Sequence, residues 1–273
     1  MQVVIPIGVG SNWENNELRY CLRSLKHCKF DVEPIILADE GVSIPWLTNV
    51  VCVPITRFYP QGLETEYGAK FFENYFSVLD KVRWFCHQDF CGDDFLLFSD
   101  DYLLLKDVDD PRLFENNALG KNNTSKLNKT RRTRHEKTIL EALELAHQEK
   151  HCNGLAEYEI HAPRFYNKAR LLKIFNRHPL EKQKTPYALA TLYYNSYYDE
   201  PKCFVKDESC RIVCYCHFDD GYHQYMPDTI SEMDYLADKY YMLSYQDKGL
   251  NVSDGFLKRW IISAYPDKCK YEL

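Results

Sequence analysis

Residues 3–40, with the sequence VVIPIGVGSNWENNELRYCLRSLKHCKFDVEPIILADE, decide the fold class. The β-branched run at 3–7 predicts a strand, and the glycines at 8–11 predict a turn after it. Apolar residues recur at helical spacing over 16–27, and Asn15 and Asn16 stand where a helix N-cap belongs. Residues 34–38 predict a second strand. A strand, a helix and a strand with short connections form a right-handed βαβ unit, so the sequence predicts a parallel sheet.

The rest of the chain extends this α/β pattern. Residues 50–55 and the wholly apolar residues 95–98 predict two more strands, the second covered on both faces. Strands are also expected at 102–105 and within 203–218, and helices at 62–82, 138–149, 167–176, 187–198, 231–243 and 254–262. The 273 residues therefore predict one large α/β domain, with a twisted, mostly parallel sheet and helices on both faces.

Composition and charge exclude several classes of protein. Apolar residues make up 45% and charged residues 27%, which excludes a disordered chain. The net charge of −6, from 34 basic and 40 acidic residues, argues against DNA or an anionic membrane as the main partner. No apolar run approaches the roughly 20 residues that span a bilayer, and no secretory signal is recognised. The 11 cysteines include no CxxC pair, so we expect free thiols in a cytoplasmic protein, with peripheral association with a membrane left open.

The acidic pair Asp100-Asp101 directly follows the apolar strand at 95–98 and its serine. Open parallel sheets bind ligands beyond the carboxyl ends of their strands. Two adjacent carboxylates are costly there unless a cation neutralises them, and Mg²⁺ or Mn²⁺ needs only one or two protein carboxylates when a diphosphate supplies further oxygens. The alternative is a plain Ser-Asp-Asp turn. The position of the pair between two apolar runs favours metal ligands at Asp100 and Asp101.

The turn of Gly8, Val9, Gly10 and Ser11 would let the backbone approach a nucleotide closely, and the helix beyond it offers an N-terminus to phosphate. It is not a full GxGxxG motif, so a flexible turn is the alternative. Asp39, at the end of the second strand, is expected either to accept hydrogen bonds from a base or ribose or to form a cap or turn.

Histidines and further acids supply candidate catalytic groups. His161 precedes an Ala-Pro turn. This position suits a catalytic base, a hydrogen-bond donor to phosphate or a metal ligand, although a lone histidine is usually structural. His217, Asp219, Asp220 and His223 form a second polar cluster. We expect His217 as a third metal ligand and Asp219 or His223 as a catalytic base, with a plain turn as the alternative for each.

The basic stretch from Lys121 to Arg134 lies in a long polar segment, residues 116–136. Its cations would clamp a diphosphate or an anionic acceptor through charge-assisted hydrogen bonds, or would simply be solvated. Binding of nucleic acid is a third interpretation, and the acidic total and the lack of interleaved aromatic residues count against it.

Several motifs resemble a known family. Residues 17–25, ELRYCLRSL, resemble the ELRYSLRS motif of the Stealth family of hexose-1-phosphate transferases. Residues 94–104, DFLLFSDDYLL, resemble that family's FLYFNDDMFL block, and the tripeptides at 45–47 and 161–163 match it as well. The resemblance spans residues 3–178 and implies a transferase that acts on a nucleotide sugar.

The first strand departs from the Stealth pattern. Residues 4–10 (VIPIGVG) and 35–41 (IILADEG) instead resemble GT-A glycosyltransferases. This resemblance implies a GT-A-like fold over residues 1–273, with a nucleotide-sugar-binding half at 1–115, the basic loop at 116–136 and an acceptor-side part at 137–273.

The two resemblances imply roles for particular residues. Asp100 and Asp101 take the place of the metal-binding DxD-type motif, Asp39 that of the nucleoside-contacting acid, and His161 that of the Stealth histidine. Arg19 and Arg23 stand in the shared basic helix, where they either face phosphate or form the helix surface.

The expected activity is therefore metal-dependent transfer of a sugar from a nucleotide sugar, by resemblance a UDP-sugar, to a glycan or a lipid-linked acceptor, with Mn²⁺ or Mg²⁺ as cofactor. The alternative is Stealth-like transfer of sugar 1-phosphate, which releases UMP. A glycosyltransferase that modifies DNA and a glycan-binding module without activity are two further hypotheses.

Overall fold

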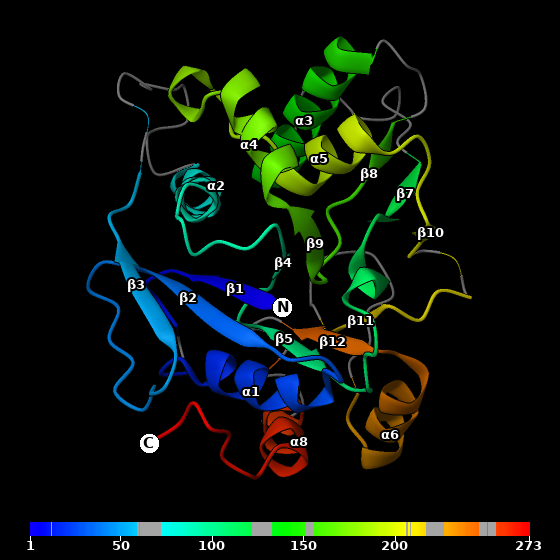
Figure 1. Ribbon diagram of the computed structural model, residues 1–273. Coiled ribbons are helices and arrows are strands. Elements are labelled where there is room, and N and C mark those ends of the chain that lie inside the picture. Colours follow the sequence, from blue (N-terminus) through cyan, green and yellow to red (C-terminus); the bar gives the residue numbers. More distant parts are fainter. Residues whose placement is uncertain are drawn as a thin grey trace.

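The computed structural model describes residues 1–11, 13–58, 60, 72–121, 133–150, 155–205, 207, 209–216, 227–245, 250 and 255–273. Within these residues the main sheet has five strands in the order β3-β2-β1-β4-β9 (Figure 1). They are β1 (Gln2–Ile7), β2 (Glu33–Asp39), β3 (Val51–Ile55), β4 (Asp94–Leu97) and β9 (Arg164–Asn167).

The main sheet is mostly parallel. β1 pairs in parallel with β2 on one side and β4 on the other, and β2 pairs in parallel with β3. The edge strand β9 runs antiparallel to β4, with Leu97 in register with Arg164. This arrangement confirms the predicted α/β architecture, and the antiparallel edge strand is an addition that the sequence analysis did not include.

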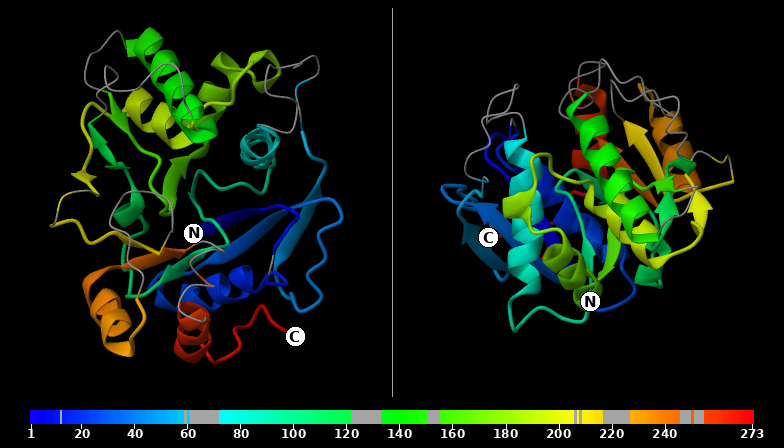
Figure 2. Two further views of the ribbon diagram at one scale, coloured as in Figure 1. Left: turned by 180° about the vertical axis from the view of Figure 1, so that it is seen from behind. Right: turned by 90° about the horizontal axis from the view of Figure 1, so that it is seen from above.

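Helices cover both faces of this sheet (Figures 1 and 2). The side chain of Val4 lies in one apolar core with residues of helices α2 to α5, whereas Val3 and Ile5 lie in the other core with residues of α1. Adjacent side chains of a strand point to opposite faces, so β1 is buried from both sides. These helices are α1 (Asn16–Ser24), α2 (Glu73–Cys86), α3 (Arg134–Lys150), α4 (Lys168–Arg177) and α5 (Leu189–Tyr197).

A second sheet of three strands, in the order β11-β12-β5, lies beside the first in the described part of the chain. Its strands are β5 (Tyr102–Leu104), β11 (Val213–Cys216) and β12 (Met242–Tyr245). The predicted helix at 231–243 is wrong at its end, because α6 (Ile230–Lys239) stops and the following apolar residues form β12. The other strands and α-helix that the structure describes are β6 (Asn117–Ala118), β7 (Gly120–Lys121), β8 (Ala156–Glu157), β10 (Cys203–Phe204) and α8 (Phe256–Ala264).

Two predicted helix starts differ from the structure. Asn15 has a positive φ and its side chain makes no cap hydrogen bond. Instead, the Ser11 hydroxyl accepts hydrogen bonds from the backbone N–H groups of Trp13 and Asn15, which orders the turn before α1. α2 begins at Glu73, whereas the first part of the helix predicted at 62–82 lies outside the described residues.

Other expectations concern cysteines and membranes. The cysteines of the described residues are all free thiols, as predicted. None of the helices described combines the length and the apolar character needed to cross a bilayer.

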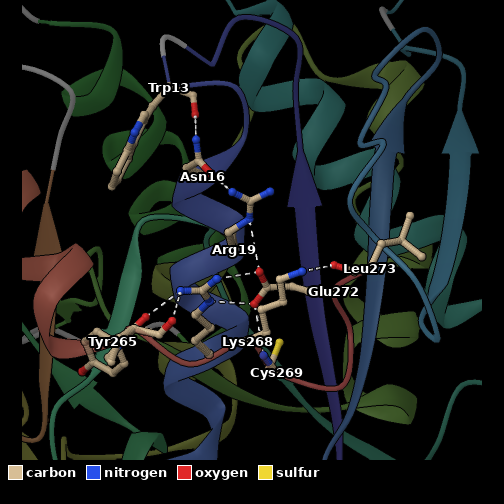
Figure 3. Close-up of polar contacts among 10 residues, drawn as sticks. Trp13, Asn16, Arg19, Tyr265, Lys268, Cys269, Glu272 and Leu273 are labelled. Carbon is tan, nitrogen blue, oxygen red and sulfur yellow. Dashed lines mark hydrogen bonds and ion pairs between the residues drawn. The ribbon is translucent and has the colours of Figure 1, made fainter.

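The C-terminal residues are bound to α1 by a buried ion pair (Figure 3). Arg23 donates from Nε and Nη2 to the two carboxylate oxygens of Glu272, at 2.6 and 2.7 Å, and from Nη1 to the carbonyl of Tyr265. Arg19 lies 3.3 Å from the same carboxylate and its guanidinium stacks on the Trp46 ring. The Glu272 side chain is only 2% exposed, so this pair is well shielded from water.

Replacing Arg23 with alanine should lower the free energy of unfolding by about 2–3 kcal/mol, because a buried carboxylate loses a bidentate partner. Burial raises the pKa of Glu272, but the hydrogen bonds from Arg23 and from the Cys269 N–H, together with the charge of Arg23, hold this pKa below its ordinary value. The contribution is therefore full at neutral pH and is lost as the pH falls through the lowered pKa.

Urea unfolding at pH 7 and pH 3 measures this effect. Lys29→Ala, which removes a partner of the exposed Asp107, is the control and should change stability far less than Arg23→Ala, because solvent screens an exposed pair. If both variants lost the same free energy of unfolding at pH 7, burial of the ion pair between Arg23 and Glu272 would not contribute to stability.

Candidate active site

Two of the predicted site segments meet at the carboxyl edge of the main sheet. β1 has β2 and β3 on one side and β4 on the other, so the order in which the strands are added reverses between β1 and β4. Sheets of this kind bind ligands at such a switch point, beyond the carboxyl ends of the strands. Gly8–Ser11 follow β1 there and Ser99–Asp101 follow β4.

The Asp101 carboxyl is the most unusual group at this edge. Its Oδ1 atom is buried and has no hydrogen-bond partner among the described residues. Burial, and next the charge of Asp100, raises the pKa of Asp101 to about 7, and Glu17 adds to the effect. Hydrogen bonds from Ser99 and from the backbone of Asp101 lower this pKa only in part. A buried carboxylate with one oxygen unsatisfied and like charges beside it is unfavourable, so this arrangement suits a bound cation.

The surroundings of Asp101 come from three separate parts of the chain. The Ser11 hydroxyl donates to the buried Glu17 carboxylate at 2.9 Å, at the start of α1. The Tyr245 backbone N–H lies 3.3 Å from the Asp101 carbonyl, at the end of β12. The Tyr245 hydroxyl is buried without a hydrogen-bond partner among the described residues. The two sheets and α1 therefore converge on the acidic pair.

The carboxylate oxygens of Asp100 and Asp101 fit a hard cation whose remaining ligands come from a bound diphosphate or from other residues. Carboxylate oxygens are the ligands that Mg²⁺ and Mn²⁺ prefer. No group of three or more His, Cys, Asp or Glu side chains that could hold a metal occurs within the described residues. The protein would therefore supply Asp100 and Asp101, and a diphosphate or other residues would complete the coordination.

Asp39 is fully engaged inside the protein. Its Oδ1 atom lies 2.6 Å from Lys81 Nζ, and its Oδ2 atom accepts from Arg57 Nε at 2.7 Å. Ser77 and the Val9 backbone N–H also donate to this carboxylate. Burial alone would raise the pKa of Asp39, but the hydrogen bonds from Lys81 and Arg57 together lower it. Asp39 therefore holds the turn after β1 in place, and its two oxygens have partners without a nucleoside.

The turn after β1 offers backbone rather than side chains to a ligand. A Cβ atom at Gly8 would lie 3.4 Å from the Asp39 carboxylate, and Gly10 has a φ of +110°, which favours glycine. Val9 is 58% exposed at the tip. Arg57 lies beside this turn, and its guanidinium also binds Glu73.

His161 lies on the chain that enters β9. It stands three residues before Arg164, the first residue of β9, which pairs with Leu97 at the end of β4. Its ring meets Tyr215 edge-on at 6.1 Å. The buried Arg164 guanidinium donates to the carbonyls of Tyr158, Ile160 and Ala162, which fixes the turn that carries His161.

The guanidinium groups of Arg19 and Arg23 are engaged within the protein and are not presented to a phosphate at this edge. The guanidinium of Arg23 is occupied by Glu272 and by backbone carbonyls, and that of Arg19 by Asn16, Glu272 and Trp46. Both residues attach the C-terminal segment to α1, which neither of the two alternatives in the sequence analysis included.

Other predicted residues lie outside the described part of the chain. These are His217, Asp219, Asp220 and His223, and the basic residues at 122–132. The last described residue before the first group, Cys216, is in register with Tyr245 of β12.

Sequence reasoning missed four residues at this edge, namely Glu17, Arg57, Lys81 and Tyr245. Two of them carried a usable signal. Lys81 lies on the apolar face of α2, four residues after Ser77, where a charge needs a buried partner. Arg57 follows β3, whose carboxyl end lies at the same edge as those of β1 and β2.

Comparisons with known proteins find similar solved structures. No family model matches the sequence, and no curated protein matches it either. The galactosyltransferase LgtC, in complex with donor and acceptor sugar analogues, matches with a TM-score of 0.45 and 11% identity over 99% of this chain and 98% of that one. An active-site mutant of LgtC gives the same values. The bifunctional glycosyltransferase WbbM matches with a TM-score of 0.46 and 12% identity over 98% of this chain, which spans 51% of WbbM.

These similar structures are glycosyltransferases, while the resemblance to the Stealth family stays a prediction. The strand order of the chain itself shows a mixed α/β fold with a mostly parallel main sheet.

Proposed function

We propose that this protein is a metal-dependent glycosyltransferase, which moves a sugar from a UDP-sugar to a glycan or a lipid-linked acceptor. The observation that carries the proposal is the buried, unpartnered Oδ1 atom of Asp101, next to Asp100 and at the switch point of the main sheet. A site with this much negative charge and free oxygen capacity suits a cation together with the diphosphate of a nucleotide sugar.

Asp100 and Asp101 would hold the Mn²⁺ or Mg²⁺ ion. When bound, the ion neutralises the negative charge of the leaving nucleoside diphosphate. Gly8–Ser11 would contact the nucleoside through their backbone, since the glycines leave room for close approach and Val9 offers an exposed apolar side chain. Asp39 would act indirectly, by holding the Val9 N–H and thus the shape of the turn.

His161 is proposed to take the proton of the acceptor hydroxyl or to donate to a phosphate oxygen. Its place on the segment that leads into β9, the strand paired with β4, supports this role. His217 as a third ligand, and Asp219 or His223 as an alternative base, remain part of the proposal. They follow Cys216, whose strand partner Tyr245 contacts Asp101.

The nucleotide released from a panel of UDP-sugars tests the proposal, measured with Mn²⁺ and with or without crude glycan acceptors. We expect UDP as the product, an increase in its release with acceptor, and loss of release when EDTA removes the metal. UMP as the product would instead indicate Stealth-like transfer of sugar 1-phosphate.

Two further outcomes would support the remaining hypotheses, a glycan-binding module and a DNA-modifying enzyme. Binding of glycans with no released nucleotide, and with no Mn²⁺-dependent thermal stabilisation by UDP, would indicate a glycan-binding module. Retention on DNA that weakens steeply with salt would indicate a DNA-modifying enzyme.

A further inference from the structure

Two thiols face each other in the connection between β10 and β11. Cys203 belongs to β10, and Cys210 lies three residues before the start of β11. Their Sγ atoms are 3.4 Å apart, and Cys203 Sγ also lies 3.2 Å from the Asn117 side-chain oxygen. Both residues are partly exposed, so a small reagent in solution can reach them.

The backbone holds this pair together. The Asp207 N–H donates to the Phe204 carbonyl at 3.0 Å, and the Cys210 N–H donates to the Asp207 carbonyl at 2.9 Å. These two successive turns fold the chain back, so that Cys210 returns to Cys203. After Cys210, the Arg211 carbonyl accepts a hydrogen bond from the backbone N–H of Tyr241, the residue before β12. The closeness of the thiols therefore follows from a folded turn and from the second sheet.

The two thiols differ in reactivity. The hydrogen bond from Cys203 lowers the pKa of Cys210 to about 7, while the same contact raises the pKa of Cys203. The thiolate is the form that attacks a disulfide, and its fraction at neutral pH sets much of the rate. Cys210 is thus suited to attack first and Cys203 to react second.

We propose that Cys203 and Cys210 form a reversible disulfide when the protein meets a small-molecule disulfide such as oxidised glutathione. The Cys210 thiolate attacks one sulfur of glutathione disulfide, forms a mixed disulfide and releases one glutathione thiolate. Cys203 then attacks the Cys210 sulfur, its proton passes to the solvent or to the departing thiolate, and the second glutathione leaves. Two protein thiols are oxidised by two electrons, and one glutathione disulfide is reduced to two glutathione molecules.

The position of the pair gives this bond a structural effect. The new covalent link would join β10 to the segment that leads into β11, and β11 ends at Cys216 beside Tyr245 and the acidic pair. A short closed loop restricts the unfolded chain, so we expect the oxidised protein to unfold at a temperature a few degrees higher than the reduced protein. This proposal does not depend on the reaction that the protein catalyses.

The test exposes the folded full-length protein to oxidised glutathione at pH 7.5, blocks remaining thiols by alkylation and analyses tryptic peptides by mass spectrometry. Trypsin cuts after Lys202, Lys206 and Arg211, so the disulfide would join peptide 203–206 to peptide 207–211. Dithiothreitol should separate the two peptides. The thiols of Cys86 and Cys91, also in contact but buried, are an internal control and should stay reduced.

Two single variants test the order of the steps. Cys203→Ser should stop at a mixed disulfide with one glutathionyl group on Cys210. Cys210→Ser should react with oxidised glutathione at least about tenfold more slowly, because burial still raises the pKa of the remaining Cys203 thiol. The proposal is overturned if the wild-type protein stops at mixed disulfides, or if Cys210→Ser reacts as fast as Cys203→Ser.

Discussion

Replacing Asp101 with asparagine should lower nucleotide release about 10²–10³-fold or more and, at the same time, make the fold more stable. The amide keeps the shape of the side chain but loses the charge that would hold the cation. It also removes a buried carboxylate whose Oδ1 atom has no partner in the described structure and whose neighbours Asp100 and Glu17 repel it. We expect a gain in the free energy of unfolding of about 1 kcal/mol above pH 7.

The pH dependence of this gain has a defined sign. Because burial and the charge of Asp100 raise the pKa of Asp101 to about 7, the folded state holds a proton between about pH 4 and 7 that the unfolded state loses. The stability of the wild-type protein therefore falls as the pH rises through this window. The difference between wild type and Asp101→Asn should be largest above pH 7 and should vanish near pH 4.

Steady-state release of UDP and urea unfolding at pH 4 and pH 8, each with and without Mn²⁺, measure the two effects. Asp107→Asn is the matched control, since Asp107 is an exposed aspartate that pairs with Lys29 and His27. This control should keep full activity. Full donor-dependent activity of Asp101→Asn would refute the assignment of Asp101 as a metal ligand.

Replacing Lys81 with methionine should cost about 3–5 kcal/mol of stability, which is the range for removing one partner of a buried ion pair. The Lys81 side chain is 2% exposed, and its ammonium group contacts the Asp39 carboxylate and donates to the Ile7 carbonyl at 2.7 Å. Methionine fills similar space but removes one donor from Asp39 Oδ1 and one from the Ile7 carbonyl oxygen. Arg57 is then the one cation left to compensate the Asp39 charge among the described contacts. Because Ile7 ends β1, the loss should also loosen the turn that follows it.

Urea unfolding measures this loss, with Lys173→Met on the exposed face of α4 as the control, expected to change stability by less than about 0.5 kcal/mol. The double variant Lys81→Met, Asp39→Asn should recover part of the loss, since the uncompensated charge is gone. A Lys81→Met protein as stable as wild type would mean that the pair of Lys81 and Asp39 is not a stabilising element.

The parts of the fold that could be predicted are those with a local pattern. The first βαβ unit shows β-branched runs around a helical apolar repeat, and the structure has β1, α1 and β2 there. β12 was mistaken for the end of a helix because its short apolar run directly follows the helical pattern of α6, and periodicity alone does not separate the two. Only its pairing with β5 and β11, which are distant in sequence, makes it a strand.

The location of the candidate site could be predicted from the sequence, but the hydrogen bonds and ion pairs between its side chains could not. The rule that ligands bind at the carboxyl ends of parallel strands locates Gly8–Ser11 and the acidic pair at one edge, as the structure does. The partners of individual side chains depend on contacts between distant segments. Arg23 pairs with a glutamate 249 residues away, and this contact has no local signal in the sequence of α1.

The turn that carries the acidic pair also joins the two sheets, because β4 belongs to the first and β5 to the second. Along β5, Tyr102 and Leu104 pack into the core around α1, whereas Leu103 packs into the core around α6 and α8. Inserting or deleting one residue at Ser99–Asp101 would exchange these faces and place each side chain in the wrong core. The length of this turn is therefore constrained by both cores, independently of its chemistry, and homologous chains should keep this length even where the acidic pair is lost.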